Sequence, residues 1–305
     1  MTRQQIVILG GGFAGLYAAY VTGGTLISDA PVATAKKHAS SYIFLHDDNR
    51  VQLLLQELGL PYITKDLAIG YYCNDRTYER ANSKMVSAYV SKAYPGVAGN
   101  LDQAISPNYF KRKLGVCNAD YLALLEVLEY DVAGHTQIAK ATRVDLKARM
   151  LYVNDDIGLS YDVLINTIPL ASFIKLAGLE RIRHSFDLSY MPLYFYESDH
   201  DMEEFQIVLD AEIDSPSLRW TAYDGKVVEE ARMARDGQEP IAHLRFGKIA
   251  ETVNTKIAKT IWFPTLEQMG VYMVGRFAQW QSHFDTEDAI SRVTEIAVKI
   301  LGGKT

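Results

Sequence analysis

The sequence predicts an α/β fold with a discontinuous, Rossmann-like dinucleotide-binding domain that includes a β-meander, and a smaller α+β domain with an antiparallel sheet. Three observations lead to this prediction. An apolar run, Ile6–Leu9, ends in a G-x-G-x-x-G pattern and is followed by helix-forming residues. Residues 189–232 alternate and are rich in Tyr, Phe and Val, which is typical of antiparallel strands. Residues 285–301 carry the apolar period of a helix.

The glycine pattern predicts a phosphate-binding turn. Gly10 permits the tight turn, Gly12 lets the backbone approach a pyrophosphate, and Gly15 lets the helix pack closely on the strand. Phe13 and Ala14 open the helix, whose free N–H groups and partial positive charge favour phosphate. The motif therefore predicts a dinucleotide site; the alternative is a glycine turn with a purely structural role.

A second strand, Thr25–Ser28, is followed by Asp29. Asp29 lies about twenty residues after the first motif glycine, where an acid that binds a ribose is expected. The alternative is a turn-forming aspartate before Pro31. Residues 31–41 show no period and predict a loop, and residues 42–45 predict another strand.

Two helices are predicted in the first half of the chain. Residues 51–58 have one apolar face, and residues 121–130 form a helix that begins after Asn118 or Asp120 as its cap. Residues 62–120 are interrupted by Gly and Pro and give no clear element.

A β-rich stretch follows. Residues 141–146, 150–153 and 161–166 predict a three-stranded meander with a turn near residues 155–158. The last of these strands leads into Thr167.

The final third contains an antiparallel sheet, a strand and a helix. The sheet over residues 189–232 has a predicted turn at Asp224–Gly225, and residues 270–277 contain a short strand. Asp285 or Thr286 caps the last helix. Its apolar face consists of Ala289, Val293, Ile296, Ala297 and Ile300.

Composition is that of an ordinary globular protein of 305 residues, with 22% charged residues and a net charge of −6. This charge does not favour nucleic acid as a partner, although the sequence does not exclude a basic groove that forms only on folding. Two cysteines, Cys73 and Cys117, indicate a reducing compartment and hence a cytoplasmic location. No apolar run is long enough for a membrane span, and no spacing typical of a metal site occurs.

Several segments resemble the flavoprotein superfamily of UDP-galactopyranose mutase, protoporphyrinogen oxidase and the flavin amine oxidases. The glycine motif is one of them. Residues 42–51, YIFLHDDNRV, are similar to a strand, polar turn and Val-initiated helix of the mutases. Residues 271–280, VYMVGRFAQW, followed by Phe284–Asp285 and a helix, resemble the C-terminal segment of the family. Thr167–Pro169 is similar to its Thr-x-Pro corner.

The resemblance implies an FAD cofactor and a set of residues that hold it. It implies that the N-terminus of the last helix meets the flavin ring, where its partial positive charge favours the reduced state. Arg276 either reaches the pyrophosphate, the ribityl chain or the substrate, or forms a salt bridge. The implied cofactor-binding residues are Gly10, Gly12, Phe13, Ala14, Gly15, Asp29, Thr167, Gly275, Arg276 and Asp285.

The chain departs from the family pattern after Asp29. An Arg-x-Gly-Gly element usually follows the second strand there, whereas residues 32–38 contain no glycine pair. Lys36 or Lys37 either replaces it as a point charge or is a solvated loop lysine. The diphosphate-binding arginines of the mutases have no definite counterpart; the candidates are Arg219, Arg245 and Arg276.

The candidate catalytic residues are His46, Trp220 and Trp280. His46 follows the predicted strand near the expected flavin ring, or else makes a structural hydrogen bond. Trp220 and Trp280 either line the active site or pack in the core. No catalytic cluster is evident, which agrees with chemistry carried by a cofactor.

The resemblance leads to a hypothesis of an FAD-dependent oxidoreductase that oxidises a C–N bond of a small amine or amino-acid-like substrate. The alternative is a redox-neutral enzyme similar to UDP-galactopyranose mutase, which uses reduced FAD. A third, non-enzymatic hypothesis is a flavin-binding accessory subunit. A more remote one is a viral flavin enzyme that tailors an amino-acid adduct on a DNA base. The oligomeric state is left open.

The domain prediction is discontinuous. Residues 1–45, 121–180 and 262–305 form the FAD-binding domain, and residues 46–120 and 181–261 form the substrate cap.

Overall fold

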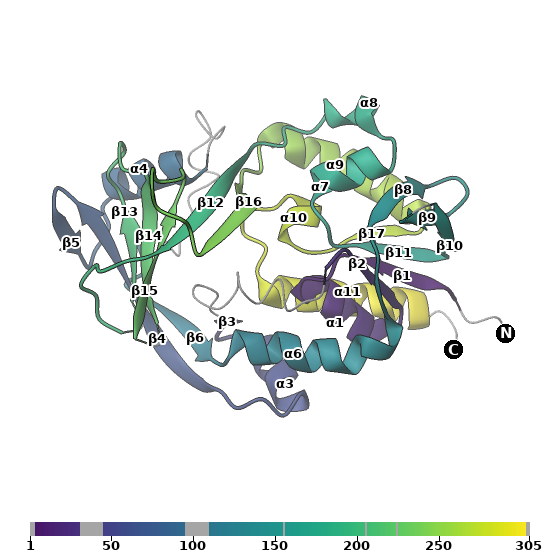
Figure 1. Ribbon diagram of the computed structural model, residues 1–305, viewed down its shortest axis with the longest axis horizontal. Helices are drawn as coiled ribbons and strands as arrows, with labels where there is room; N and C mark the ends of the chain where they lie inside the picture. Colours follow the sequence, from purple (N-terminus) through teal and green to yellow (C-terminus); the bar gives the residue numbers. More distant parts are fainter. Residues whose placement is uncertain are drawn as a thin grey trace.

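The computed structural model has two regions, each organised around a large sheet (Figure 1). The residues it describes are 4–30, 45–94, 110–154, 156–204, 206–223 and 225–302. The predicted loop at 31–41 with Lys36 and Lys37, the start of the strand predicted at 42–45, and Asp224 lie outside the described residues.

The first region contains a five-stranded parallel sheet, which confirms the predicted α/β class. Its strand order is β17-β11-β1-β2-β7, and each neighbouring pair is parallel. β1 and β11 are apolar runs buried on both faces, as interior strands of a parallel sheet require. The strands are β1 (Ile6–Leu9), β2 (Thr25–Ser28), β7 (Thr136–Ile138), β11 (Val163–Asn166) and β17 (Val271–Met273).

Four helices pack on one face of this sheet and form one core with it. Alternate residues of β1, such as Ile6 and Ile8, join Leu16 of α1 and Val293 of α11 in this core. The helices are α1 (Phe13–Thr22), α3 (Asn49–Glu57), α6 (Tyr121–Val132), which runs on into the 3-10 turn η2 (Ala133–His135), and α11 (Thr286–Leu301).

The other face of the parallel sheet is covered by three helices and the meander. Val7 and Leu9 of β1 pack there with Phe173 of α7 and Leu151 of the meander. The helices on this side are α7 (Leu170–Leu176), followed by the short α8 (Glu180–Arg183), and α9 (Val253–Gln268).

The meander is present, but its third strand is not the one predicted. It consists of β8 (Ala141–Asp145), β9 (Met150–Val153) and β10 (Ile157–Ser160). The predicted third strand is β11, which instead lies between β1 and β17 in the parallel sheet. The reason is visible in the burial: β11 is buried throughout, whereas β10 is mostly exposed, as an edge strand can be.

The second region is a nine-stranded sheet, and it confirms the predicted antiparallel sheet over residues 189–232. The order is β16-β12-β15-β14-β13-β4-β6-β3, with β5 on β4; only the β13–β4 pair is parallel. α4 (Ser83–Ala93) packs on it. The strands are β3 (Leu45–His46), β4 (Ile63–Cys73), β5 (Arg76–Tyr78), β6 (Lys113–Asn118), β12 (Tyr190–Glu197), β13 (Gln206–Asp210), β14 (Ser217–Tyr223), β15 (Lys226–Ala231) and β16 (Ala242–Ile249).

The predicted helices α3, α6 and α11 are confirmed, and the structure identifies their caps. Asp120 accepts hydrogen bonds from the N–H groups of Leu122 and Ala123, so it, and not Asn118, begins α6. Asp285 caps α11 in a capping box with Asp288. The helices α4, α7 and α9 were not predicted. α4 does have an apolar face at helical spacing, with Met85, Val86, Tyr89, Val90 and Ala93 buried, whereas Pro264 interrupts the pattern of α9.

Among the described helices, none is long and apolar enough to cross a membrane. Cys73 and Cys117 are free thiols. The predicted domain boundaries stay a prediction; α9 spans the predicted boundary between residues 261 and 262.

Candidate cofactor and substrate site

The glycine turn joins β1 to α1 at the carboxyl edge of the parallel sheet. Gly10 has a φ of +115°, and a Cβ there would lie 2.5 Å from the Oγ1 of Thr167. The Thr167 hydroxyl donates to the Leu9 carbonyl at 2.9 Å and so ties β11 to the turn. A Cβ on Gly15 would lie 1.8 Å from the Gly10 carbonyl oxygen. The fold itself therefore requires glycine at both positions.

Gly12 differs from these two. It has an ordinary φ of −78°, it is exposed, and a Cβ there would meet no atom within 4 Å. The fold gives no reason for glycine at this position. Gly12 caps α1. The N–H groups of its first residues, Phe13 and Ala14, have no carbonyl acceptor within the helix, because no turn precedes them. An open glycine at a helix N-terminus is what a closely bound phosphate requires.

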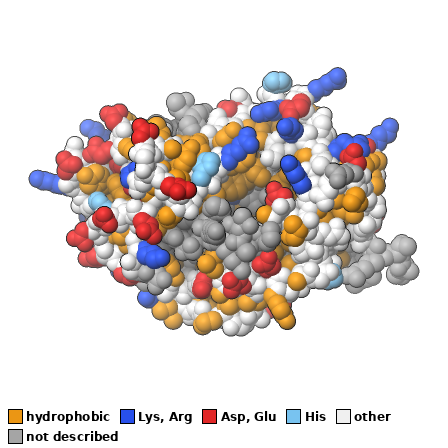
Figure 2. Space-filling model, viewed as in Figure 1, with side chains coloured by type: hydrophobic (Ala, Val, Ile, Leu, Met, Phe, Trp, Pro, Cys, Tyr) orange, Lys and Arg blue, Asp and Glu red, His pale blue; other side chains and the backbone are white. Residues whose placement is uncertain are grey.

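A larger cavity of about 900 Å³ lies on one side of the turn. Gly10 and Asp29 line it together with the aromatic rings of Tyr190 and Phe246. Four cations also line it, one directly before β8 and the others in α7, α8 and β16. Figure 2 shows Lys and Arg side chains beside a hollow with hydrophobic side chains inside it. The cationic residues are Lys140, Lys175, Arg183 and Arg245.

A smaller cavity of about 450 Å³ lies on the other side of the turn. The β17–α10 turn forms part of its wall, where Gly275 has a φ of +95° and a Cβ would be 3.3 Å from Ala14. α10 (Arg276–Gln279) and the N-terminus of α11 complete this wall. The predicted residues that line the smaller cavity are Gly12, Phe13, Ala14, His46, Thr167, Gly275, Arg276 and Asp285.

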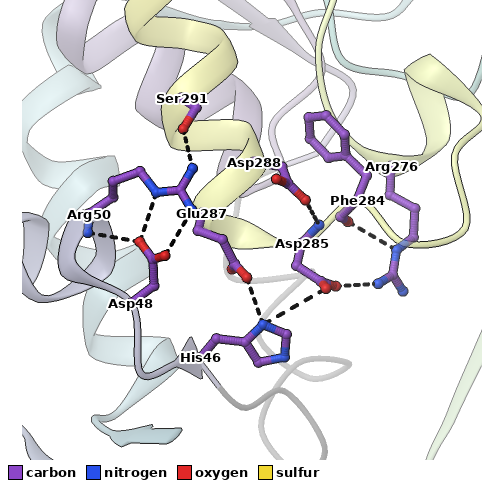
Figure 3. A network of polar contacts seen from close by, with 9 residues as sticks. All are labelled: His46, Asp48, Arg50, Arg276, Phe284, Asp285, Glu287, Asp288 and Ser291. Carbon is purple, nitrogen blue, oxygen red and sulfur yellow. Dashed lines mark hydrogen bonds and ion pairs between the residues drawn. The ribbon is translucent and has the colours of Figure 1, made fainter. Parts of the chain in front are cut away.

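A network of polar side chains surrounds the N-terminus of α11 (Figure 3). His46 Nδ1 lies 2.7 Å from Glu287 Oε1 and 3.8 Å from Asp285 Oδ2. Arg276 donates to Asp285 at 2.7 Å and to the Phe284 carbonyl at 3.2 Å. Arg276 thus forms an ion pair, the second of the two roles considered for it, while its exposed portion still borders the cavity.

The network shifts the protonation of its members. The hydrogen bond to Glu287 raises the pKa of His46, against the opposing effect of burial. Burial, the largest single effect, would raise the pKa of Glu287. The hydrogen bonds from His46 and from the backbone, together with the charge of His46, outweigh it, and the pKa is lowered. The pair therefore favours imidazolium and carboxylate. The carboxylates in the first turn of α11 cancel the partial positive charge of the helix N-terminus. The cationic side chains of His46 and Arg276 add positive charge beside it.

The same network bears on metal binding. The ligating atoms of His46, Asp285 and Glu287 lie within 4.8 Å of one another. However, His46 hydrogen-bonds to Glu287 Oε1 and Arg276 pairs with Asp285, so these groups already have partners, although Glu287 Oε2 has no hydrogen bond among the described residues. We therefore describe the group as an ion-pair network and assign no metal to it.

The two candidate tryptophans are not among the described residues that line either cavity. Trp220 stacks on His200 at 4.7 Å between ring centroids and contacts Tyr72. Trp280 ends α10 in a left-handed conformation, and its side chain is fully buried in the core on the α7 and α9 side of the parallel sheet. Trp280 also contacts the rings of Tyr190 and Phe246, which line the larger cavity. A catalytic role for either tryptophan stays a prediction.

The arginine candidates are separated: Arg245 lines the larger cavity, whereas Arg219 and Arg276 line the smaller one. Sequence reasoning did not identify Glu287, the partner of His46. Its position two residues after the cap Asp285, in the first turn of a helix, was the available signal.

Comparison with known proteins agrees with the predicted resemblance at the level of the fold. No protein-family model matches the sequence, and no curated protein matches it. The structure of a reduced UDP-galactopyranose mutase is similar, with a TM-score of 0.72 and 12% identity over 99% of this chain and 94% of the other. The structure of a fatty acid isomerase from P. acnes has a TM-score of 0.63 and 11% identity, over 97% of this chain and 98% of the other. The structure of putrescine oxidase bound to putrescine has a TM-score of 0.58 and 10% identity, over 99% of each chain.

Proposed function

We propose that this chain binds FAD across its glycine turn and is an FAD-dependent enzyme. The observation that carries the proposal is Gly12: it is exposed, unstrained and without neighbours, at a helix N-terminus that opens between two cavities. Its missing side chain fits a bound pyrophosphate. The fold shared with UDP-galactopyranose mutase and putrescine oxidase supports the same cofactor.

The two cavities suit the two halves of an extended dinucleotide. Asp29, at the end of β2, lines the larger cavity, so the ribose and adenine belong there. The Lys and Arg side chains that line this cavity favour binding of the FAD phosphates. The flavin belongs in the smaller cavity, beside Gly275, Arg276 and the N-terminus of α11.

FAD, when bound, supplies a hydride acceptor, so the protein needs no catalytic dyad of its own. The residues of this chain bind and orient the reactants and exclude water. Phe284 and Phe277 give the smaller cavity apolar surface. The His46–Glu287 pair holds a proton at the edge of this cavity, on Nδ1 of the imidazole.

The reaction that we propose is oxidation of a C–N bond in a small amine or amino-acid-like substrate. This chemistry needs position and desolvation more than a protein base. The similarity to UDP-galactopyranose mutase favours a second candidate, a redox-neutral reaction of a sugar nucleotide that uses reduced FAD.

One experiment tests the cofactor and the reaction in sequence. The purified protein is reconstituted with FAD, and its visible spectrum is recorded. A protein that binds no FAD overturns the proposal. In the reconstituted protein, an oxidisable amine should bleach the flavin anaerobically, whereas a mutase substrate should leave it oxidised and react only after prior reduction. A flavin that no candidate substrate changes would favour the accessory-subunit hypothesis.

A further inference from the structure

The wall of the smaller cavity opposite the glycine turn comes from the nine-stranded sheet. The side chains that β4, β6, β13 and β16 contribute to it are apolar, and β14 contributes one cation, Arg219. The apolar residues are Leu67, Leu114, Ile207 and Leu244. His46 of β3, at the edge of this sheet, also lines the cavity. A guanidinium among these apolar side chains is costly unless it interacts with a ligand or a partner.

Arg219 is held in place from behind by a buried carboxylate. It lies opposite Glu230 in the β14–β15 register, and its Nε is 3.0 Å from Glu230 Oε2. Lys248 Nζ lies 3.0 Å from Glu230 Oε1. Glu230 is only 3% exposed, so this triad places two cations on one buried carboxylate.

The three residues of the triad are all ionised at neutral pH. Burial would raise the pKa of Glu230, but Arg219 and Lys248 outweigh this and lower it. Glu230 is therefore ionised at neutral pH, and the three residues together carry one positive charge. Arg219 is the member of the triad that lines the smaller cavity.

We infer that the substrate of the smaller cavity has an apolar body and a carboxylate, and that the carboxylate pairs with Arg219. One excess positive charge matches a monoanion, whereas a phosphate monoester carries about −1.5 to −2. A guanidinium binds a carboxylate through two parallel hydrogen bonds, which orients the rest of the molecule. The inference rests on the proposed function, because it makes Arg219 a specificity residue of that site.

The test compares two probes of equal shape, hexanoate and hexanamide, on the FAD-reconstituted protein. Binding is measured by perturbation of the flavin spectrum and by calorimetry. We expect hexanoate to bind about 10- to 100-fold more tightly than hexanamide. Arg219→Met should abolish this preference, and Arg219→Lys should retain part of it, because the ammonium keeps the charge and loses the bidentate geometry.

Arg235→Met is the matched control. Arg235 pairs with Glu229, the buried neighbour of Glu230 on β15, but it is not among the described residues that line the cavity. This variant should keep the preference for hexanoate.

Equal binding of the two probes by the wild-type protein would overturn the inference, and this comparison requires no variant to fold. Inorganic phosphate that displaces hexanoate and binds more tightly would also overturn it. The calorimetry is repeated without FAD, so a failure of cofactor binding contradicts the proposed function and leaves the test of Arg219 intact.

Discussion

Replacing Gly12 by valine separates what the fold needs from what the ligand needs. The backbone at Gly12 is extended, and a Cβ there meets no atom within 4 Å. Loss of a glycine stabilises by about 0.4–1 kcal/mol through the unfolded chain. Valine is a poorer helix cap than glycine, by a cost on the order of 1 kcal/mol. The two effects oppose each other, so the unfolding free energy of the FAD-free protein should change by less than about 1 kcal/mol.

The effect on FAD should be much larger. A side chain at Gly12 would occupy the space in front of the N–H groups of Phe13 and Ala14. Hydrogen bonds to a charged group contribute about 1.5–3 kcal/mol each. Loss of one or two of them should weaken FAD binding by about 10-fold to more than 1,000-fold.

The assay is titration of the FAD-free protein with FAD, followed by the quenching of flavin fluorescence, together with urea unfolding of the same samples. Gly134→Val is the control: Gly134 lies in η2, it is not among the described residues that line the two cavities, and a Cβ there also meets no atom within 4 Å. Unchanged FAD affinity in Gly12→Val would refute the assignment of the turn. A large loss of stability in that variant would refute the claim that the fold leaves this position open.

Three further results are expected. Gly15→Ala should destabilise the FAD-free protein by about 3 kcal/mol in urea unfolding, because its Cβ would overlap a backbone carbonyl. His46 has a raised pKa in the folded protein, so its stabilisation is full below about pH 6.5 and is lost as the pH rises through the folded value. The melting temperature should therefore fall less between about pH 6 and about pH 9 in His46→Gln than in the wild type, and equal falls would contradict this. Glu230→Gln should cost about 3 kcal/mol in urea unfolding, since it leaves two cations without their carboxylate; a neutral result would contradict the triad.

The elements that sequence predicted well are those whose pattern is local. β1, the glycine turn and α1 follow one another without a break, and α11 has five apolar residues at helical spacing, all buried. Short-range sterics and a continuous apolar face are sufficient to define such elements. The pairing of β11 was different, because its place between β1 and β17 depends on contacts with segments far away in the chain.

The candidate site shows the same division. Trp220 was a candidate for catalysis and its neighbour Arg219 a candidate for binding a diphosphate; of the two, only Arg219 is among the described residues that line the smaller cavity. Successive side chains of a strand point to opposite faces, so a shift of one residue exchanges core and cavity. The register of β14 against β15 fixes this choice, since it pairs Arg219 with Glu230 and Trp220 with Glu229. A single sequence does not contain that register.

The glycine motif itself combines two kinds of constraint. Gly10 and Gly15 are required by steric contacts inside the protein, with or without a ligand. Gly11 belongs with them, since a Cβ there would lie 2.3 Å from the Ser28 Oγ. Gly12 alone among the four has no such contact. Most of the pattern therefore reports how β1 and α1 pack, and this explains why it predicts the fold so well. Gly12 is the motif glycine that the fold does not require, so a variant at this one position tests dinucleotide binding separately from the fold.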